Sequence, residues 1–226
     1  MKLFCFKKDI YITLLENNVK EKNYLTEYKC SKILETPYTE MELYEKYKSN
    51  IVPFLEYYVS VMGEPSFEIT NEIRAMFGHI TDYRLSANDV LKKNLEKAYG
   101  HLRRVSLDIS KILCDEYDKI FSSIIKKLYK YDYRKCSDNF LRRYLELYFE
   151  ARECYLHAQN EEKLGSNNNT AYYAYFNALQ KYIDLKNHYL KYKKTIEKQR
   201  RKAIIGKSVS VVVSILLLVV NIISIF

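Results

Sequence analysis

The stretch "SANDVLKKNLEKAYGHLRRVSLDISKILCDEYDKI", residues 86–120, decides the fold class. Its apolar residues recur every three or four positions, which is the spacing of one face of an α-helix. Ser86 followed by Asp89 is typical of a helix start, because a serine with an acidic residue three positions on resembles a capping box. We therefore expect a long helix that contributes a core stripe to a helical bundle. The stripe comprises Leu91, Leu95, Ala98, Leu102, Val105, Ile109, Ile112 and Ile120.

Helical patterns flank this stretch on both sides. Residues 9–34 form a first expected helix, and Thr39 with acidic residues behind it predicts the cap of a second, whose course Pro53 disturbs. Residues 63–66, "GEPS", indicate a turn. The next segment, residues 67–85, carries an apolar face made of Ile69, Ile73, Met76, Phe77 and Ile80.

The second half of the chain continues in the same way. Ser137 is expected to cap a helix that ends near residue 163, and "GSNNNT", residues 165–170, is the clearest loop. From residue 171 onward only Gly206 interrupts the helical pattern. We therefore expect the last helix to run unbroken to the end of the chain, with a length of roughly 80 Å.

Composition supports an all-α class and bounds the partners. The 226 residues contain Gly 5 and Pro 3, too few for the turns of an all-β fold. The net charge of +9 favours anionic partners, although a chain rich in Lys, Asn, Ile and Tyr is also typical of an AT-rich genome. The scattered cysteines indicate reduced thiols in a cytosol, and neither a disulfide framework nor a zinc site.

The tail "GKSVSVVVSILLLVVNIISIF", residues 206–226, is uncharged from Val209 onward, which meets the lower limit for a helix that crosses a bilayer. Basic residues precede it, so the bulk of the chain is expected to be cytoplasmic, held by a single-pass C-terminal anchor. The expected division is a cytosolic bundle (1–170), a basic connecting helix (171–205) and a transmembrane helix (206–226). The apolar stretch at the start of the sequence is too short for a signal peptide, so none is expected.

Polar residues interrupt this tail along one heptad seam, and the other faces are apolar. Small and polar side chains allow membrane helices to approach and hydrogen-bond, which predicts self-association. If three or more copies surround a water-filled lumen, the same seam lines a pore with a leucine ring as its gate. The seam comprises Lys207, Ser210, Ser214, Leu217, Asn221 and Ser224.

Two similar units, "FGHI" at residues 77–80 and "YGHL" at residues 99–102, place glycine and histidine inside neighbouring helices. An antiparallel pair with a close crossing at Gly78 and Gly100 would bring His79 and His101 together. Arginines nearby would bind a phosphate bidentately. The alternative is that both histidines bond a carboxylate such as Asp82 or Asp108 at the edge of the core. The expected anion-binding set is Arg74, His79, Arg84, His101, Arg103 and Arg104.

The segment "EIRAMFGH", residues 72–79, resembles the Arg, four-to-six spacer, His motif of HEPN-type domains. That family is all-helical, often dimeric, and includes many ribonucleases of prokaryotic defence and toxin systems. The resemblance implies that His79 transfers a proton and that Arg74 stabilises the charge of the phosphate, with no metal required. Ala75 stands where the family commonly has a polar residue.

Two further segments interleave Tyr with Lys and Arg, at residues 126–135 and 188–194. They predict binding of single-stranded nucleic acid or of anionic lipid, unless the rings belong to the core. No Gly-rich phosphate loop, carboxylate cluster for a metal, or cofactor pattern is present in the sequence.

The leading hypothesis is a homo-oligomeric membrane effector, a pore or channel former controlled by a nucleotide or nucleic-acid ligand on its cytosolic helical domain. Small membrane effectors of bacterial anti-phage defence are similar in plan. The alternatives are a membrane-tethered HEPN-like ribonuclease and a noncatalytic tail-anchored adaptor, so the chain is not assigned as an enzyme.

Overall fold

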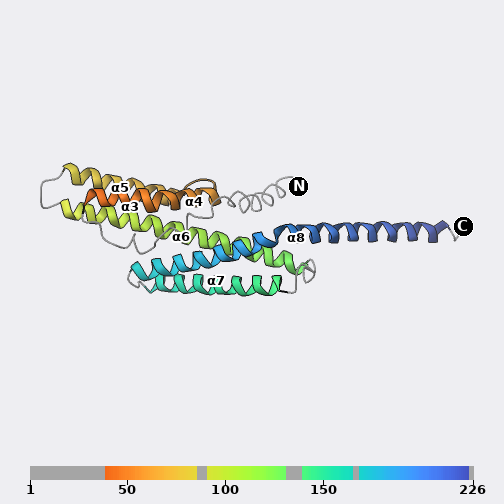
Figure 1. Ribbon diagram of the computed structural model, residues 1–226. Coiled ribbons are helices and arrows are strands. Elements are labelled where there is room, and N and C mark those ends of the chain that lie inside the picture. The colour runs from red at the N-terminus through yellow and green to blue at the C-terminus, as the bar shows by residue number, and fades with distance from the viewer. Residues whose placement is uncertain (1–38, 86–90, 131–138, 165–167, 224–226) are drawn as a thin grey trace.

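The structure is a computed structural model that describes residues 39–85, 91–130, 139–164 and 168–223 (Figure 1). Every regular element within these ranges is a helix, which confirms the all-α prediction. The expected helix at residues 9–34 and the expected caps Ser86 and Ser137 lie outside the described residues. The elements are α3 (Glu40–Lys46), the π-helical turn η2 (Tyr47–Ile51), α4 (Val52–Met62), α5 (Phe67–Leu85), α6 (Leu91–Lys130), α7 (Phe140–Lys163) and α8 (Asn168–Ile223).

The first described helix begins at the predicted cap, and its regular turns are disturbed near Pro53 as the sequence predicts. The Thr39 hydroxyl accepts from the Glu42 amide at 3.2 Å, and the Glu42 carboxylate accepts from the Thr39 amide at 3.3 Å, which forms a capping box. Pro53 has no N–H to donate, so the preceding turn widens to a π-helix in which Val52 N–H donates to the Tyr47 carbonyl. The helix therefore continues past the proline at the cost of one wide turn.

The predicted turn at residues 63–66 joins α4 to α5. Gly63 has φ of +91°, a conformation that suits glycine because it has no side chain. The Ser66 hydroxyl then accepts from the Ile69 amide at 3.3 Å and caps α5. The chain reverses here, so α5 returns along α3 and α4 (Figure 1).

Helix α6 is shared between two halves of the molecule (Figure 1). Its first half packs on α5, and its second half packs on α8 and α7 and also contacts α4, where the hydroxyl oxygens of Tyr57 and Tyr117 lie 2.5 Å apart. The predicted stripe is confirmed for Leu95 through Ile109, whose stripe residues are all buried, while Ile112 is partly buried. On α5, Phe77 is 37% exposed, and its ring lies against Tyr44 and Tyr47 rather than inside the core.

The core of the second half is built from aromatic rings. Phe121 stacks on Tyr182 at 6.3 Å and meets Tyr144 edge-on at the same distance. The hydroxyl groups of these buried tyrosines reach polar groups at the edge, as when Tyr182 donates to the Asp118 carboxylate at 2.9 Å. Tyrosine suits this core because its ring is buried while its hydroxyl keeps a partner.

Helix α8 is continuous from Asn168 to Ile223, which confirms the unbroken last helix over the described residues. The expected loop at residues 165–170 is wrong for residues 168–170, which are helical. Its first part packs on α7 and α6, and Ile196 is the last buried residue of the described chain. Beyond that point the helix projects away from the other helices (Figure 1). Helix α8 begins before residue 171 and passes residue 206 without a break, so no helix end marks either boundary of the expected three-part division. That division stays a prediction.

Within the part of the chain that the structure describes, no helix combines the length and the hydropathy required to cross a bilayer.

Candidate functional site

The two histidine units meet where α5 packs on α6. The rings of His79 and His101 stack with centroids 5.2 Å apart and an interplanar angle of 20°. Glu72 lies two turns before His79 on α5, and it contacts both His101 and Arg104 of α6, so the helices run in opposite directions. The predicted pairing of the histidines is confirmed.

The reason given for the two glycines is wrong. A Cβ atom added at Gly78 or at Gly100 would meet no atom within 4 Å, so neither glycine is needed for a close crossing. Side chains of both helices instead set the spacing. The glycines leave open space along the helices next to the histidine pair.

Glu72 is the residue that sequence analysis missed. Its Oε2 lies 2.6 Å from His101 Nδ1 and 3.7 Å from an Arg104 guanidinium nitrogen. The carboxylate therefore takes the place that Asp82 or Asp108 was expected to fill beside His101. The available signal was the spacing: residues seven apart, such as Glu72 and His79, lie on the same face of a helix.

His79 is held differently. Its Nδ1 is buried and has no hydrogen-bond partner among the described residues, with the Asp82 carboxylate 3.9 Å away. Burial lowers the pKa of His79, the neighbouring His101 and Lys97 lower it further, and Asp82 opposes them. A neutral imidazole at neutral pH follows, so His79 offers a hydrogen-bonding group and not a fixed positive charge.

The four arginines of the expected anion site do not converge. Arg84 turns to α3, where it forms an ion pair with Glu40 at 2.6 Å. Arg103 lies over the Tyr99 ring at 5.8 Å, and Arg104 faces Glu72. Arg74 is exposed on α5, and His79 stands five positions further along the helix, which places the two side chains about 140° apart around it. The structure thus brings together His79, His101 and Arg104 around a carboxylate.

The Tyr and Lys segment at residues 188–194 belongs to the core. Tyr189 is buried, and Tyr192 lies against the rings of Phe140 and His188. These rings are therefore not available to stack on nucleic-acid bases. Lys191 and Lys194 of the segment are exposed, whereas Lys193 is buried. In the other segment, residues 131–135 lie outside the described residues.

The projecting part of α8 carries the predicted polar seam. Ser210, Ser214 and Leu217 are exposed, and the Ser214 hydroxyl donates to the Ser210 carbonyl at 2.9 Å. The side chains of Lys207 and Asn221, and all of Ser224, lie outside the described part of the structure. Apolar neighbours share the exposure: Val209, Val211, Val212 and Val213 are 55%, 58%, 55% and 47% exposed.

Comparisons of the chain with protein families, curated proteins and solved structures give no match. Among the described residues, no group of three or more His, Cys, Asp and Glu side chains is placed to hold a metal ion. The function is therefore inferred from the residues and their geometry.

Proposed function

We propose that the protein is an oligomeric membrane effector whose last helix inserts into a bilayer and self-associates there. The observation that carries the proposal is the second part of α8, which leaves the bundle as a continuous helix with exposed apolar side chains (Figure 1). Val211, Val212 and Val213 are consecutive, so their side chains point in three directions around the helix. A helix that is apolar on all sides is stable only where lipid or other helices cover it.

The magnitude of the hydrophobic effect supports this placement. Burial of apolar surface is worth roughly 25 cal/mol per Å², so each exposed Val or Leu on this segment gains on the order of 1.5–3 kcal/mol when it is covered. The uncharged stretch of the sequence runs from Val209 to the last residue. Its length matches the hydrocarbon thickness of a bilayer.

Self-association is the role we assign to the seam that contains Ser210 and Ser214. The Ser214 hydroxyl already donates to the Ser210 carbonyl of its own helix, so the gain comes from small side chains that let helices approach closely and from hydroxyl oxygens that can still accept a bond across the contact. A ring of such helices with Leu217 at its narrowest point would form a pore that opens when it fills with water. The continuous α8 would transmit a rearrangement of the bundle directly to this ring.

We assign the control of the pore to an anionic ligand, a nucleotide or an oligonucleotide, at the α5–α6 cluster. His79, His101 and Arg104 supply hydrogen-bond donors, and the open space beside Gly78 and Gly100 gives access to them. Glu72 already neutralises Arg104, so the ligand must displace this carboxylate. Binding would thereby change the contact between α5 and α6.

The mass of the full chain in mild detergent, measured by light scattering, tests the assembly. A triple variant with Ser210, Ser214 and Asn221 changed to Leu is expected to lose the oligomer. The matched control changes Val211, Val212 and Val219 to Leu, which alters the other faces of the same helix, and it should keep the wild-type mass. A monomer in all three proteins rules out self-association and leaves the membrane-tethered ribonuclease and the noncatalytic adaptor.

Planar-bilayer recordings test the pore and its control. We expect conductance that changes when ATP or a single-stranded RNA oligonucleotide is added, and no such response in His79→Ala. Absence of conductance under every condition rules out the pore. A response that survives in His79→Ala places the ligand elsewhere.

The HEPN-like ribonuclease stays a second candidate because two stacked histidines, one of them bonded to a carboxylate, are suited to proton transfer. This function predicts RNA cleavage that survives deletion of residues 209–226 and is lost in His79→Ala and Arg74→Ala. Cleavage retained in both point variants rules it out.

A further inference from the structure

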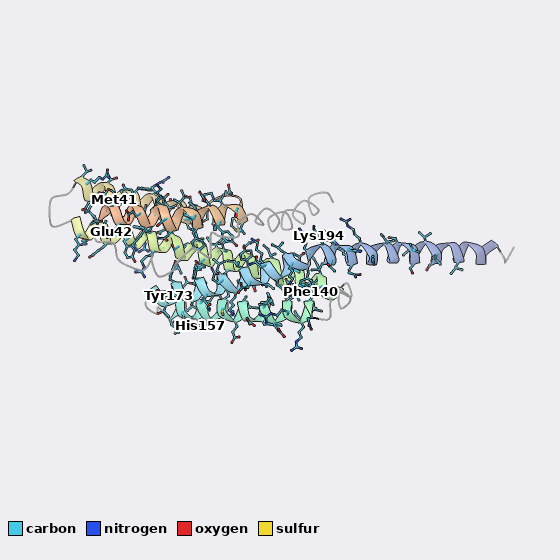
Figure 2. The ribbon with its side chains drawn as sticks, in the orientation of Figure 1. Met41, Glu42, Phe140, His157, Tyr173 and Lys194 are labelled. Carbon is cyan, nitrogen blue, oxygen red and sulfur yellow. The ribbon has the colours of Figure 1, made fainter. Side chains whose placement is uncertain are left out.

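In the second half of the molecule, the end of α6 and the start of α7 lie close to the point where α8 leaves the bundle (Figure 1). At the start of α7, the Phe140 ring stacks on His188 at 5.4 Å and lies 5.1 Å from Tyr192. Helix α6 advances alongside α8, since Cys114 contacts Tyr175 and Asp118 contacts Tyr182. The last residue of α6, Lys130, lies about 18 Å beyond Asp118, so the end of α6 is near the level of Lys194 on α8. Figure 2 shows Phe140 and Lys194 at this end and His157 and Tyr173 at the other.

Exposed cations gather at this end of the bundle. Lys126 and Lys127 stand on the last turns of α6, and Arg142 and Arg143 stand on the first turn of α7. The two arginines share the carboxylate of Glu146, at 2.9 and 3.2 Å, so part of their charge is neutralised. The largest contribution comes from α8, where the exposed cations are Lys191, Lys194, Lys198, Arg201 and Lys202.

These five cations of α8, named here the basic stripe, occupy one face of the helix. The first four are three or four residues apart and Lys202 directly follows Arg201, which places all five opposite the face on which Tyr189, Lys193 and Ile196 are buried. Beyond Lys202 the described exposed side chains are apolar except for three serines: they are Ile205, Val209, Val211, Val212, Val213 and Leu217, with Ser208, Ser210 and Ser214. A row of cations next to exposed apolar side chains is complementary to a lipid surface, in which headgroups lie next to hydrocarbon.

We propose that the basic stripe binds the headgroups of anionic phospholipids and so fixes the depth and the tilt at which α8 meets the membrane. The proposal rests on the insertion of α8 proposed above. We prefer lipid to nucleic acid because the tyrosines beside the stripe are packed against Phe140 and His188 and cannot stack on bases.

The contribution of each cation to membrane binding should depend on its position along the helix. The stripe from Lys191 to Lys202 is roughly 16 Å long at 1.5 Å per residue. The Debye length at physiological ionic strength is about 8 Å, so an upright α8 brings only the cations near Lys202 fully into the surface potential. A cation near such a surface strengthens binding about fivefold, whereas one beyond the Debye length adds little.

The test uses flotation to measure the fraction of the full chain, made in the presence of vesicles, that binds to them. One set of vesicles contains phosphatidylcholine alone, and the other contains phosphatidylcholine with phosphatidylserine. We expect binding to both, at least fivefold stronger on the anionic vesicles, with the difference removed by 1 M salt, where the Debye length is about 3 Å. Arg201→Gln with Lys202→Gln is expected to remove most of the difference, and Lys191→Gln with Lys194→Gln less of it.

The matched control is Lys92→Gln with Lys93→Gln, which removes the same charge from exposed residues at the far end of α6. This control should bind as the wild type does. All the variants change exposed side chains, and circular dichroism checks that their helicity is unchanged.

The outcomes separate the two proposals. Equal binding to both vesicles, insensitive to salt, overturns the headgroup site and leaves the insertion of α8 intact. Binding to anionic vesicles only supports the headgroup site and overturns the insertion. Single-stranded RNA that removes the protein from anionic vesicles at an equal concentration of phosphate charge shows that the stripe prefers nucleic acid, and overturns the lipid assignment.

Discussion

The two parts of α8 are one continuous helix with opposite surroundings. Up to Ile196 its buried residues repeat every three or four positions, so a single face meets α6 and α7 while the other faces carry charge. In the projecting part, apolar residues stand on consecutive positions and are exposed together. The difference teaches that both parts form helix equally well, and that the periodicity of the apolar residues separates the part that packs in the bundle from the part that projects from it.

The largest effect should come from a residue of the packed part. Tyr182 is fully buried among Phe121, Tyr117 and Tyr155, so Tyr182→Ala leaves a cavity and should lower the free energy of unfolding by about 3–5 kcal/mol. In the projecting part, Val212→Ala should change it by less than about 0.5 kcal/mol. Denaturant unfolding of the full chain in mild detergent, followed by circular dichroism, measures both. Equal losses would show that the two parts do not differ in packing.

A smaller effect is expected from the Tyr182 hydroxyl alone. Tyr182→Phe keeps the ring and removes the donor to Asp118, a bond of 2.9 Å at the edge of the aromatic core. Burial, together with the nearby Asp118, raises the pKa of Tyr182 far above its usual value, so the hydroxyl stays a donor at all ordinary pH. We expect a loss of about 1–2 kcal/mol.

A double-mutant cycle with Asp118→Ala, which removes the acceptor, isolates this bond. The two substitutions should not add, because the second removes a partner that the first has already left unpaired. Additive losses would show that the hydroxyl and the carboxylate act independently.

The sequence was sufficient for what depends on periodicity. The stripe of α6, the Thr39 cap and the disturbance at Pro53 follow from local rules, and the pairing of His79 with His101 follows from two similar units on adjacent antiparallel helices. These predictions need only the face of each helix.

What the sequence missed depends on the register between helices. Glu72 rather than Asp108 bonds His101, and Arg84 turns to Glu40, because axial offsets decide which long side chains meet. The bonds between buried tyrosines and carboxylates were also missed, since a tyrosine on an apolar face does not reveal where its hydroxyl points. Asp108 itself is partly buried near Glu72, and both burial and that carboxylate raise its pKa.

The glycines of the histidine units give the third prediction. Because a Cβ at Gly78 or Gly100 meets no atom within 4 Å, Gly→Ala at either position should raise the stability by about 0.5–1 kcal/mol through helix propensity. Gly63→Ala is the control and should destabilise, because its φ of +91° strains any side chain. A loss of stability in Gly78→Ala would show that another molecule, such as a second copy, fills the space beside α5.

The smallest effect concerns pH, and it compares the two halves of the molecule. Burial lowers the pKa of His79 in the first half and of His188 in the second, where Arg143 and Lys191 lower it further and the Phe140 carbonyl opposes them. Below the ordinary histidine pKa of about 6.5, the unfolded chain binds more protons at these histidines than the folded chain does. The free energy of unfolding therefore decreases as the pH is lowered. His79→Gln and His188→Gln should each reduce the loss measured between pH 7 and pH 5 by unfolding in urea. If only His188→Gln does so, the lowered pKa of His79 is refuted.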